Sequence, residues 1–439
     1  MRNSNIRRKR NCLKIPFFNL KFIILITLAV KIYACITDDA KSKFYRVSNQ
    51  SFVLNDSQIF IKGANYWYGG HIAQSEEGIA RLQSELDFLR SQGINNLRVM
   101  ACSEGDSSYG YRIGNSFQQK LGKFNNNILG LDRLLIELQK RRMSAVLVLG
   151  NNWEWSGGFG QYLAWHQDRH GENILPKTAN WDWENYCNYI SEFYSCKYCI
   201  SNYWKSVETL VSRVNSVDGI PYSEHPAIFS WELANEPRPM RISAWKDYKN
   251  WISKTSSLIK SLDSNHLITI GTEGSISTFQ NLEDFKEIHS FENIDYSTVH
   301  IWPKTWQWYD GSSEASIADT TLNKTLNYIK EHAKVCNEIN KPLVIEEFGL
   351  HRDRNGFSSI ESVKNRNIYY QTVFSQIDQL ELAGFNFWGA VALPENVSDY
   401  GFMKKGMAFS ADPPQEEQGL YGVYESDTTT WKIIKGFHP

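Results

Sequence analysis

The sequence lacks an excess of either charge. It carries 47 basic and 48 acidic side chains, which gives a formal net charge of -1 at pH 7. Proteins that bind nucleic acid attract its phosphates through a basic face, which this balance does not provide. We therefore expect no nucleic-acid partner and an uncharged ligand.

Several motifs of other enzyme classes are also missing. No Gly-rich phosphate loop opens a helix after the first apolar run, no G-x-S-x-G elbow is present, and no H-E-x-x-H occurs. His166 and His170, with Asp168 between them, have a spacing that metal ligands use, but the first histidine is not followed by glutamate and the stretch reads as a loop. We predict neither a metal nor a cofactor.

A long apolar run is absent too. Residues 22–30 are apolar, but lysines on both sides keep the run below the ~20 apolar residues that a spanning helix needs. The basic cluster at residues 7–10 before this run is typical of a secretory signal. We predict a signal peptide over residues 1–35, a secreted, extracellular protein and no stable membrane insertion. An uncleaved anchor is the alternative.

Cysteine is scarce, with 7 in 439 residues. Five of them follow the leader, so at least one should be a free thiol even in an oxidising compartment. Cys196 and Cys199 form a C-x-x-C, for which we predict a short-loop disulfide because no thioredoxin-like strand precedes it. Four glycosylation acceptor sequences point toward a eukaryotic secretory pathway; they begin at Asn49, Asn55, Asn323 and Asn396.

Aromatic residues, in contrast, are abundant. They make up 14% of the chain, with 15 Trp and 22 Tyr. Flat rings stack well on the apolar faces of sugar rings, so this composition suits carbohydrate binding. Packing within the core is the alternative role for any one of these rings.

The chain after the leader has no low-complexity linker, charge block or internal repeat, so we predict one domain over residues 36–439. Eight apolar runs are typical of buried strands. They cover residues 59–65, 95–101, 144–151, 227–236, 266–272, 295–300, 343–348 and 385–390.

Helical periodicity fills the intervals between these runs. It is clearest at residues 76–92, 129–142, 203–214, 242–262, 320–339, 363–382 and 428–436. The alternation predicts an α/β protein with a (β/α)8 TIM barrel, whose reactive groups lie at the carboxyl ends of the strands. Because the chain exceeds the ~250 residues typical of that fold, loops such as 152–181 should be extended and form the walls of an active-site cleft. A doubly wound open sheet is the rival fold, and we expect a monomer.

Two strand-like runs end on carboxyl groups. The segment W-E-L-A-N-E-P-R-P ends with Asn235 and Glu236 before a proline that cannot donate to a sheet ladder, and P-L-V-I-E-E-F-G carries Glu346 and Glu347. In a parallel barrel these groups would meet at one rim. Strict two-residue alternation would send neighbouring side chains to opposite faces, so the first strand must twist or break as it leaves the barrel.

Other polar or aromatic residues also fall at or just past predicted strand ends, namely Asn65, Arg98, Asn151, Glu273, His300 and Trp388. The ordered set of motifs resembles glycoside hydrolase family five in the retaining barrel clan and, within it, the endo-β-1,4-mannanases. The resemblance covers nearly all of the mature chain, through G-A-N-Y-W-Y, W-E-L-A-N-E-P-R, T-E-G, H-I-W-P, E-E-F-G and F-W-G.

This resemblance implies that Glu236 is the general acid and base and that Glu347 is the nucleophile, whereas Glu346 is structural. In a retaining mechanism the two catalytic carboxyls lie ~5 Å apart, close enough for direct attack on the anomeric carbon. For most Asp or Glu residues a solvated or salt-bridged surface position is the ordinary expectation, and only the strand-end context reverses it here.

The resemblance also implies substrate-binding roles. Asn235 would bond the 2-hydroxyl of the sugar, Arg98 would keep the nucleophile ionised, and His300 would lie near the nucleophile. A structural ion pair is the alternative for Arg98, and a satisfied core position for His300. Trp388 would form the floor beneath the sugar, although a barrel tryptophan can be a core residue.

Trp302 departs from the pattern, since many relatives carry tyrosine there. Its indole N–H can donate to the nucleophile but cannot accept a hydrogen bond. Further cleft residues are expected on weaker grounds, because surface packing explains each of them equally well: Trp153, Arg238, Trp306 and Trp308.

The sequence thus predicts a secreted endo-β-1,4-mannanase that cleaves internal bonds of mannan, galactomannan or glucomannan. Its partner would be a neutral β-mannan polysaccharide. A β-1,4-glucanase on the same scaffold is the alternative enzyme, and W-E-L-A-N-E-P-R favours mannan over glucan. A catalytically silent carbohydrate-binding protein is the third hypothesis, although both glutamates are present.

Overall fold

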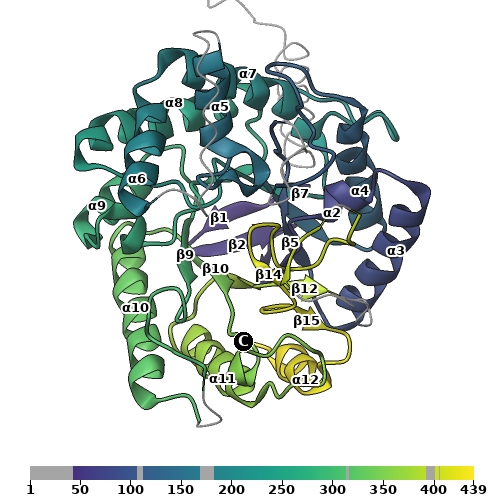
Figure 1. Cartoon of the computed structure of the whole chain (residues 1–439), viewed down its shortest axis with the longest axis vertical. Helices are drawn as coiled ribbons and strands as arrows, with labels where there is room; N and C mark the ends of the chain where they lie inside the picture. The colour runs from purple at the N-terminus through teal and green to yellow at the C-terminus, as the bar shows by residue number, and fades with distance from the viewer. Residues whose placement is uncertain (1–42, 106–111, 169–181, 313–315, 392–400, 405) are drawn as a thin grey trace, which may run out of the picture. The chain divides into compact units, whose positions relative to one another are not determined.

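Eight parallel strands form the central sheet of the computed structural model (Figure 1). The structure describes residues 43–105, 112–168, 182–312, 316–391, 401–404 and 406–439. Around the sheet the strands follow the order β8-β7-β6-β5-β4-β11-β10-β9. Their bounds are β4 (Ile61–Asn65), β5 (Asn96–Met100), β6 (Ser144–Val148), β7 (Ile228–Glu232), β8 (Leu267–Thr269), β9 (Ser297–Ile301), β10 (Leu343–Phe348) and β11 (Gly384–Phe387).

Hydrogen bonds across the seam between β8 and β9 close the sheet. The backbone N–H of Asp295 donates to the carbonyl of Ile268 at 2.8 Å, and that of His300 donates to the carbonyl of Glu273 at 3.2 Å. All eight predicted strands are present, and the predicted (β/α)8 barrel is confirmed.

Helices surround this barrel (Figure 1). Every predicted helix is found. Residues 242–262 form a short 3₁₀ turn, Ile242–Ala244, followed by the helix Trp245–Leu262. Apart from two helices in the loop after β6, the helices between or after the barrel strands are α2 (Gly69–Ile72), α3 (Glu76–Ser91), α4 (Leu129–Lys140), α7 (Lys197–Val211), α8 (Trp245–Leu262), α9 (Leu282–His289), α10 (Asp319–Glu338), α11 (Lys364–Gln379) and α12 (Thr428–Gly436).

The prediction of an extended loop over residues 152–181 is partly wrong. It contains helix α5 (Gly158–Asp168), and α6 (Trp183–Ser191) follows it. Phe159 and Tyr162 of α5 are buried, so packing against the barrel's helices stabilises a segment with weak periodicity. His166 therefore lies on a helix rather than in a loop, and His170 lies outside the described residues.

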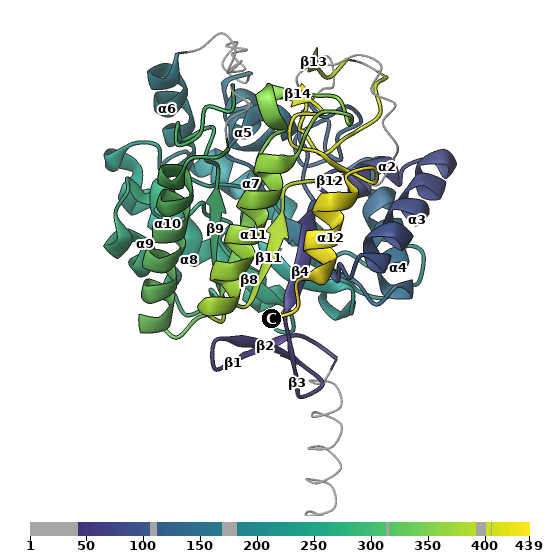
Figure 2. The ribbon, with the colours of Figure 1, turned by 90° about the horizontal axis from the view of Figure 1, so that it is seen from below.

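A three-stranded antiparallel sheet lies at the end of the barrel where the strands begin (Figure 2). Its strands are β1 (Arg46–Ser48), β2 (Ser51–Leu54) and β3 (Ser57–Ile59), joined by two-residue turns with positive φ at Asn49, Gln50, Asn55 and Asp56. Such turns match the twist of a hairpin. Phe52 from β2 packs on Phe229 and Tyr296, so this sheet covers the apolar floor of the barrel.

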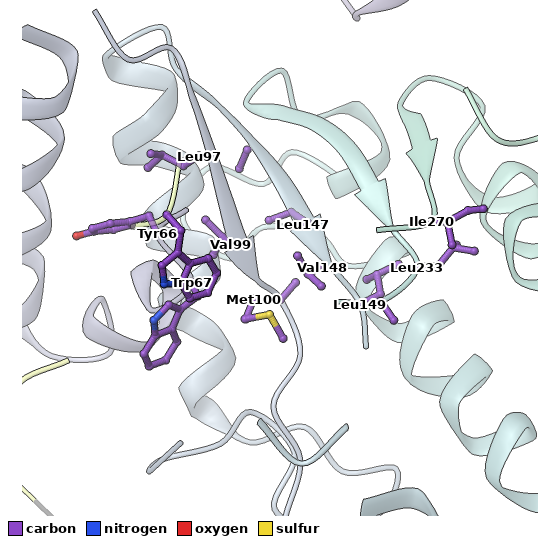
Figure 3. Close-up of a cluster of buried hydrophobic side chains, with 14 of the residues drawn as sticks. Tyr66, Trp67, Leu97, Val99, Met100, Leu147, Val148, Leu149, Leu233 and Ile270 are labelled. Carbon is purple, nitrogen blue, oxygen red and sulfur yellow. The ribbon is translucent and has the colours of Figure 1, made fainter. Parts of the chain in front are cut away.

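Side-chain alternation along β5 separates an apolar outer face from a polar interior. Leu97 and Val99 belong to the main hydrophobic core, part of which Figure 3 shows. Asn96, on the opposite face of β5, accepts a hydrogen bond from Asn386 at 2.9 Å and donates one to Ser144 at 3.0 Å. Buried polar groups need such partners. This layer supports Arg98, the next inward residue.

Four two-residue strands complete the fold after β11: β12 (Ala390–Val391), β13 (Gly401–Phe402), β14 (Glu417–Gln418) and β15 (Val423–Tyr424). All elements named here belong to the unit Phe44–Pro439. The predicted signal residues 1–35 lie outside the described residues. Within the described part of the chain, no helix is long and apolar enough to cross a membrane.

The predicted disulfide between Cys196 and Cys199 is confirmed, at the start of α7. Cys102, Cys187 and Cys336 are free thiols, and all three are buried. The expectation of at least one free thiol is therefore also confirmed.

Candidate active site

A break in the backbone after β7 brings Glu236 to the rim of the barrel. The strand ends at Glu232, four residues before the predicted end, and Asn235 then forms an isolated parallel bridge with Asn151. Glu236 adopts the left-handed conformation with φ of 49°. This turn re-aims its side chain, so the predicted break, which alternation required, is confirmed.

A β-bulge in β10 has the same effect on Glu346 and Glu347. The register pairs Ile345 with Val299 and Glu347 with His300, which leaves Glu346 as an extra residue on β10. A bulge places two neighbouring side chains on one face of a sheet. Both carboxyl groups therefore point into the barrel, where both lie within 4 Å of Arg98.

His300 links the two predicted catalytic carboxyls. Its Nδ1 atom lies 2.8 Å from Oε1 of Glu236 and 3.4 Å from Oε2 of Glu347. One side-chain nitrogen of His300 and one carboxyl oxygen of each glutamate all lie within 4.8 Å of one another. Only 8% of Glu236 and 3% of Glu347 is exposed, so the pair is almost removed from water yet reaches the rim.

Arg98 is the central cation beneath this pair. It lies in the middle of β5, not at the strand end as predicted, and it contacts the carboxylate of Glu347. Its Nε donates to Glu232 at 2.7 Å, and its Nη2 donates to the amide oxygen of Asn235 at 2.8 Å. These bonds fix the guanidinium so that its charge faces the predicted nucleophile.

Each of the two predicted catalytic carboxyls accepts a hydrogen bond from an indole N–H. Trp153 donates to Oε2 of Glu236 at 2.6 Å, and Trp302 donates to Oε2 of Glu347 at 3.1 Å. An indole can only donate, so both bonds favour the ionised carboxylate. The predicted contact of the Trp302 indole N–H with Glu347 is therefore present.

Burial raises the pKa of Glu236 and of Glu347, and the Glu236 carboxylate adds to the rise at Glu347. Arg98 opposes the rise at both residues, and Arg238 opposes it at Glu236. The pair therefore keeps a proton that isolated carboxyls would lose. Arg98 touches only Glu347 of the two, and this contact favours an ionised Glu347 and a proton on Glu236. Burial also lowers the pKa of His300 to about 4, which leaves its imidazole neutral near neutral pH.

Arg238 and Glu273 support Trp153. Both guanidinium contacts with the Glu273 carboxylate are short, at 2.5 and 2.6 Å. The guanidinium carbon of Arg238 lies 5.3 Å from the centre of the Trp153 ring. This cation–π contact holds the indole whose N–H reaches Glu236.

A cleft of about 730 Å³ opens above these residues. Its lining includes both predicted catalytic carboxyls and several aromatic side chains. A second cavity of about 390 Å³ shares Thr305, Glu416 and Tyr421 with it. The aromatic lining residues are Trp153, Trp155, Trp183, Trp302, Trp306, Trp388 and Tyr421.

A sequence model of glycoside hydrolase family 5 beta-mannosidase-like proteins matches residues 42–438. The chain belongs to glycoside hydrolase family 5. Among its relatives, the mannan endo-1,4-beta-mannosidase 1 of Arabidopsis thaliana is 30% identical over 368 residues, which are 80% of this chain and 81% of that one.

Solved structures give the same family. A family 5 mannosidase from Rhizomucor miehei has a TM-score of 0.81 and 31% identity over 90% of this chain and 97% of its own. A glutamate-to-alanine variant of that mannosidase, in complex with mannosyl-fructose, has a TM-score of 0.82 at 31% identity over the same shares of both chains. The endo-beta-1,4-mannanase of Thermotoga petrophila shares the fold, with a TM-score of 0.67 at 24% identity over 87% of this chain and 77% of its own.

The family 5 fold brings all nine predicted site residues into one region. Arg98 and His300 lie beneath the carboxyls, and the rest line the cleft: Trp153, Asn235, Glu236, Arg238, Trp302, Glu347 and Trp388. Trp306 also lines the cleft, whereas Trp308 packs on Trp306 and Tyr328.

Three lining residues of this family 5 enzyme carried no usable signal in the sequence. Trp183 begins a helix after a long insertion, and Glu416 and Tyr421 come from a C-terminal loop without periodicity. Such loops reach the cleft through tertiary packing alone. Glu273 stood at a predicted strand end, but its pairing with Arg238 could not be inferred.

Glu236, His300 and Glu347 also form the one cluster of potential metal-binding groups among the residues that the structure describes. The approaching atoms are already hydrogen-bonded to one another and to Trp302. Arg98, in contact with Glu347, would repel a divalent cation. The arrangement is therefore better suited to proton transfer.

Proposed function

We propose that this family 5 enzyme is a secreted endo-β-1,4-mannanase that retains the configuration of the anomeric carbon. It would cleave internal bonds of mannan, galactomannan or glucomannan. The observation that carries the proposal is the pair of buried carboxyls, Glu236 and Glu347, held on either side of His300 Nδ1 within an open aromatic cleft.

In the first step, Glu236 would donate its proton to the glycosidic oxygen while Glu347 attacks the anomeric carbon. The separation of at most 4.8 Å between their approaching oxygens supports direct attack, because an inverting pair needs room for a water molecule. The contact with Arg98 supports an ionised Glu347 as the attacking group.

In the second step, the carboxylate of Glu236 would take a proton from water, which then releases the sugar from Glu347. The charge of Glu347 is absent in the covalent intermediate, which removes the repulsion that kept Glu236 protonated. Trp388 would support the sugar ring from below, and Asn235 would bond its 2-hydroxyl.

The substrate assignment is supported by the names of the relatives and by the cleft. The cleft of about 730 Å³ shares lining residues with a second cavity of about 390 Å³, which supports a polymeric substrate rather than a single sugar. The cleft contains no cluster of basic side chains among its lining residues, which favours a neutral polymer. Secretion is supported by the leader and by the disulfide.

Purified protein should lower the viscosity of galactomannan and release short manno-oligosaccharides. Cleavage of carboxymethyl cellulose but not of mannan would overturn the substrate, and release of mannose alone would overturn internal cleavage. Light scattering should give the mass of a monomer.

Two alanine variants test the catalytic roles separately. Azide should rescue Glu347→Ala with a product of inverted configuration, because it replaces the nucleophile. It should rescue Glu236→Ala on a substrate with a good leaving group, with retained configuration, because it attacks the intermediate. A fully active Glu347→Ala protein would contradict the assignment.

A further inference from the structure

Glu346 is a buried carboxyl that the proposed reaction leaves unused. It is fully buried, and the bulge in β10 adds it to the interior of the barrel. Among the buried side-chain atoms that the structure describes, both of its carboxyl oxygens are without a hydrogen-bond partner. A buried polar group in that state is costly, so its nearest polar neighbours indicate its role.

Two groups approach the Oε2 atom of Glu346. Nε of Arg98 is 3.7 Å away, but it already donates to Glu232 at 2.7 Å. Nε2 of His300 is 3.5 Å away and, like the carboxyl, has no hydrogen-bond partner among the described residues. Two unsatisfied groups therefore face each other, and one proton on Nε2 would serve both.

The other ring nitrogen of His300 faces the predicted acid. Nδ1 lies 2.8 Å from Oε1 of Glu236, a distance at which a proton must lie between the two atoms. A neutral imidazole carries only one proton. If that proton is on Nε2, the proton between Nδ1 and Oε1 belongs to Glu236.

We propose that Glu346 is a positioning residue that holds His300 in the Nε2–H tautomer, so that Nδ1 accepts the acidic proton of Glu236. The tautomer assignment rests on an ionised Glu346 and on the distances at the two ring nitrogens, whereas its effect on catalysis rests on the proposed function of Glu236. Glu346 thus acts on the acid through His300.

An acceptor that faces a carboxyl favours the protonated form and raises its pKa. Without Glu346, the proton of His300 is free to move to Nδ1 and to donate to the Glu236 carboxylate, which would lower the pKa of Glu236. The charged and titratable groups around His300 are Arg98 from β5, Glu236 and Glu273 from the loops after β7 and β8, and Glu346 and Glu347 from β10.

Nitrogen NMR of protein labelled with ¹⁵N-histidine tests the tautomer directly. The signals of His300 among the ten histidines are identified by their loss in His300→Gln. His332 serves as an internal reference for the opposite tautomer, because its Nε2 accepts the N–H of Ser275 at 2.8 Å and its Nδ1 lies 2.7 Å from the carbonyl of Tyr328. We expect His300 to show Nε2–H.

Two variants of nearly equal volume separate the tautomer from the charge. Glu346→Gln removes the charge but keeps an oxygen that accepts from Nε2–H, whereas Glu346→Leu removes both. The Gln variant should keep the Nε2–H tautomer and the wild-type alkaline limb of kcat/KM. The Leu variant should change to Nδ1–H, and its alkaline limb should move toward acid by roughly half to one pH unit.

Three results would overturn the proposal: a wild-type His300 with its proton on Nδ1, a Leu variant that keeps Nε2–H, or equal shifts of the limb in both variants without a change of tautomer. Failure of the proposed function would appear differently, as full hydrolysis of mannan by Glu236→Gln. Because the wild-type spectrum requires neither activity nor a folded Leu variant, it decides the tautomer by itself.

Discussion

The two indole N–H groups provide a way to tell the acid from the nucleophile. Trp153→Phe removes the donor to Glu236, and Trp302→Phe removes the donor to Glu347, while each keeps an aromatic ring in the cleft. Each loss should raise the pKa of the carboxyl concerned, because the lost bond favoured the ionised form. The two variants should therefore change opposite limbs of the pH profile.

The size of each shift follows from the hydrogen bond that is lost. A hydrogen bond to a charged group contributes about 1.5–3 kcal/mol, and 1.36 kcal/mol corresponds to one pKa unit. Since Trp153 is only half-buried, we take the lower end and expect a shift of about one pH unit for its 2.6 Å bond. The longer 3.1 Å bond of Trp302 should give roughly half a unit.

The two variants affect different limbs of the pH profile because the two carboxyls have different proposed roles. Catalysis requires Glu236 protonated, so Trp153→Phe should move the alkaline limb of kcat/KM to higher pH. It requires Glu347 ionised, so Trp302→Phe should move the acidic limb to higher pH, with a smaller change at the alkaline limb because its indole also lowers the pKa of Glu236.

Manno-oligosaccharides should be the substrate in this assay, because an activated aryl leaving group would not need the acid. If Trp153→Phe moved the acidic limb and Trp302→Phe moved the alkaline limb, the roles of the two carboxyls would have to be exchanged. Unchanged profiles in both variants, with unchanged structures, would refute the reasoning.

Other predictions concern affinity and stability. Arg98→Met should abolish hydrolysis and lower the free energy of unfolding by about 3–5 kcal/mol in urea titrations, because it leaves buried carboxylates without their cation; wild-type stability would contradict this. Trp183 is 52% exposed at the cleft, so Trp183→Ala should raise KM about fivefold for long manno-oligosaccharides and leave kcat unchanged; an unchanged KM would remove Trp183 from the binding surface. The free energy of unfolding should fall as the pH is lowered from 6.5 to 5. In this range three histidines take up protons in the unfolded chain but stay neutral in the folded protein, where they are buried. They are His71 and His289, with pKa values of about 3, and His332, with a pKa of about 4. Each should contribute roughly 1–2 kcal/mol to the loss, measured by urea unfolding at both pH values. A stability that does not change with pH would contradict the burial of these histidines.

The barrel was predictable because its strands and helices carry strong periodic patterns. All eight strands were identified, but helices α2, α5, α6 and α9 and the antiparallel sheet of β1–β3 were missed. The strands of that sheet are three or four residues long, too short for alternation to stand out.

The site was predictable as a set of residues but not as a geometry. Alternation alone could not place Glu236 beside Asn235 or Glu347 beside Glu346, since a left-handed residue in one case and a bulge in the other override it. The indole bond to Glu236 depends on Trp153, whose loop is held by Arg238. Such contacts arise from tertiary packing, which a single sequence does not encode in its periodicity.

The bulge in β10 implies that a deletion here would do less harm than its position suggests. Ile345 faces the outer helices, so a chain without residue 346 would regain a regular ladder with Glu347 still directed inward. The extra residue thus contributes one ionisable group to the interior without displacing Glu347, the proposed nucleophile. In such a barrel, lengthening a strand by one residue is a way to retune proton transfer that no single substitution at the existing positions can reproduce.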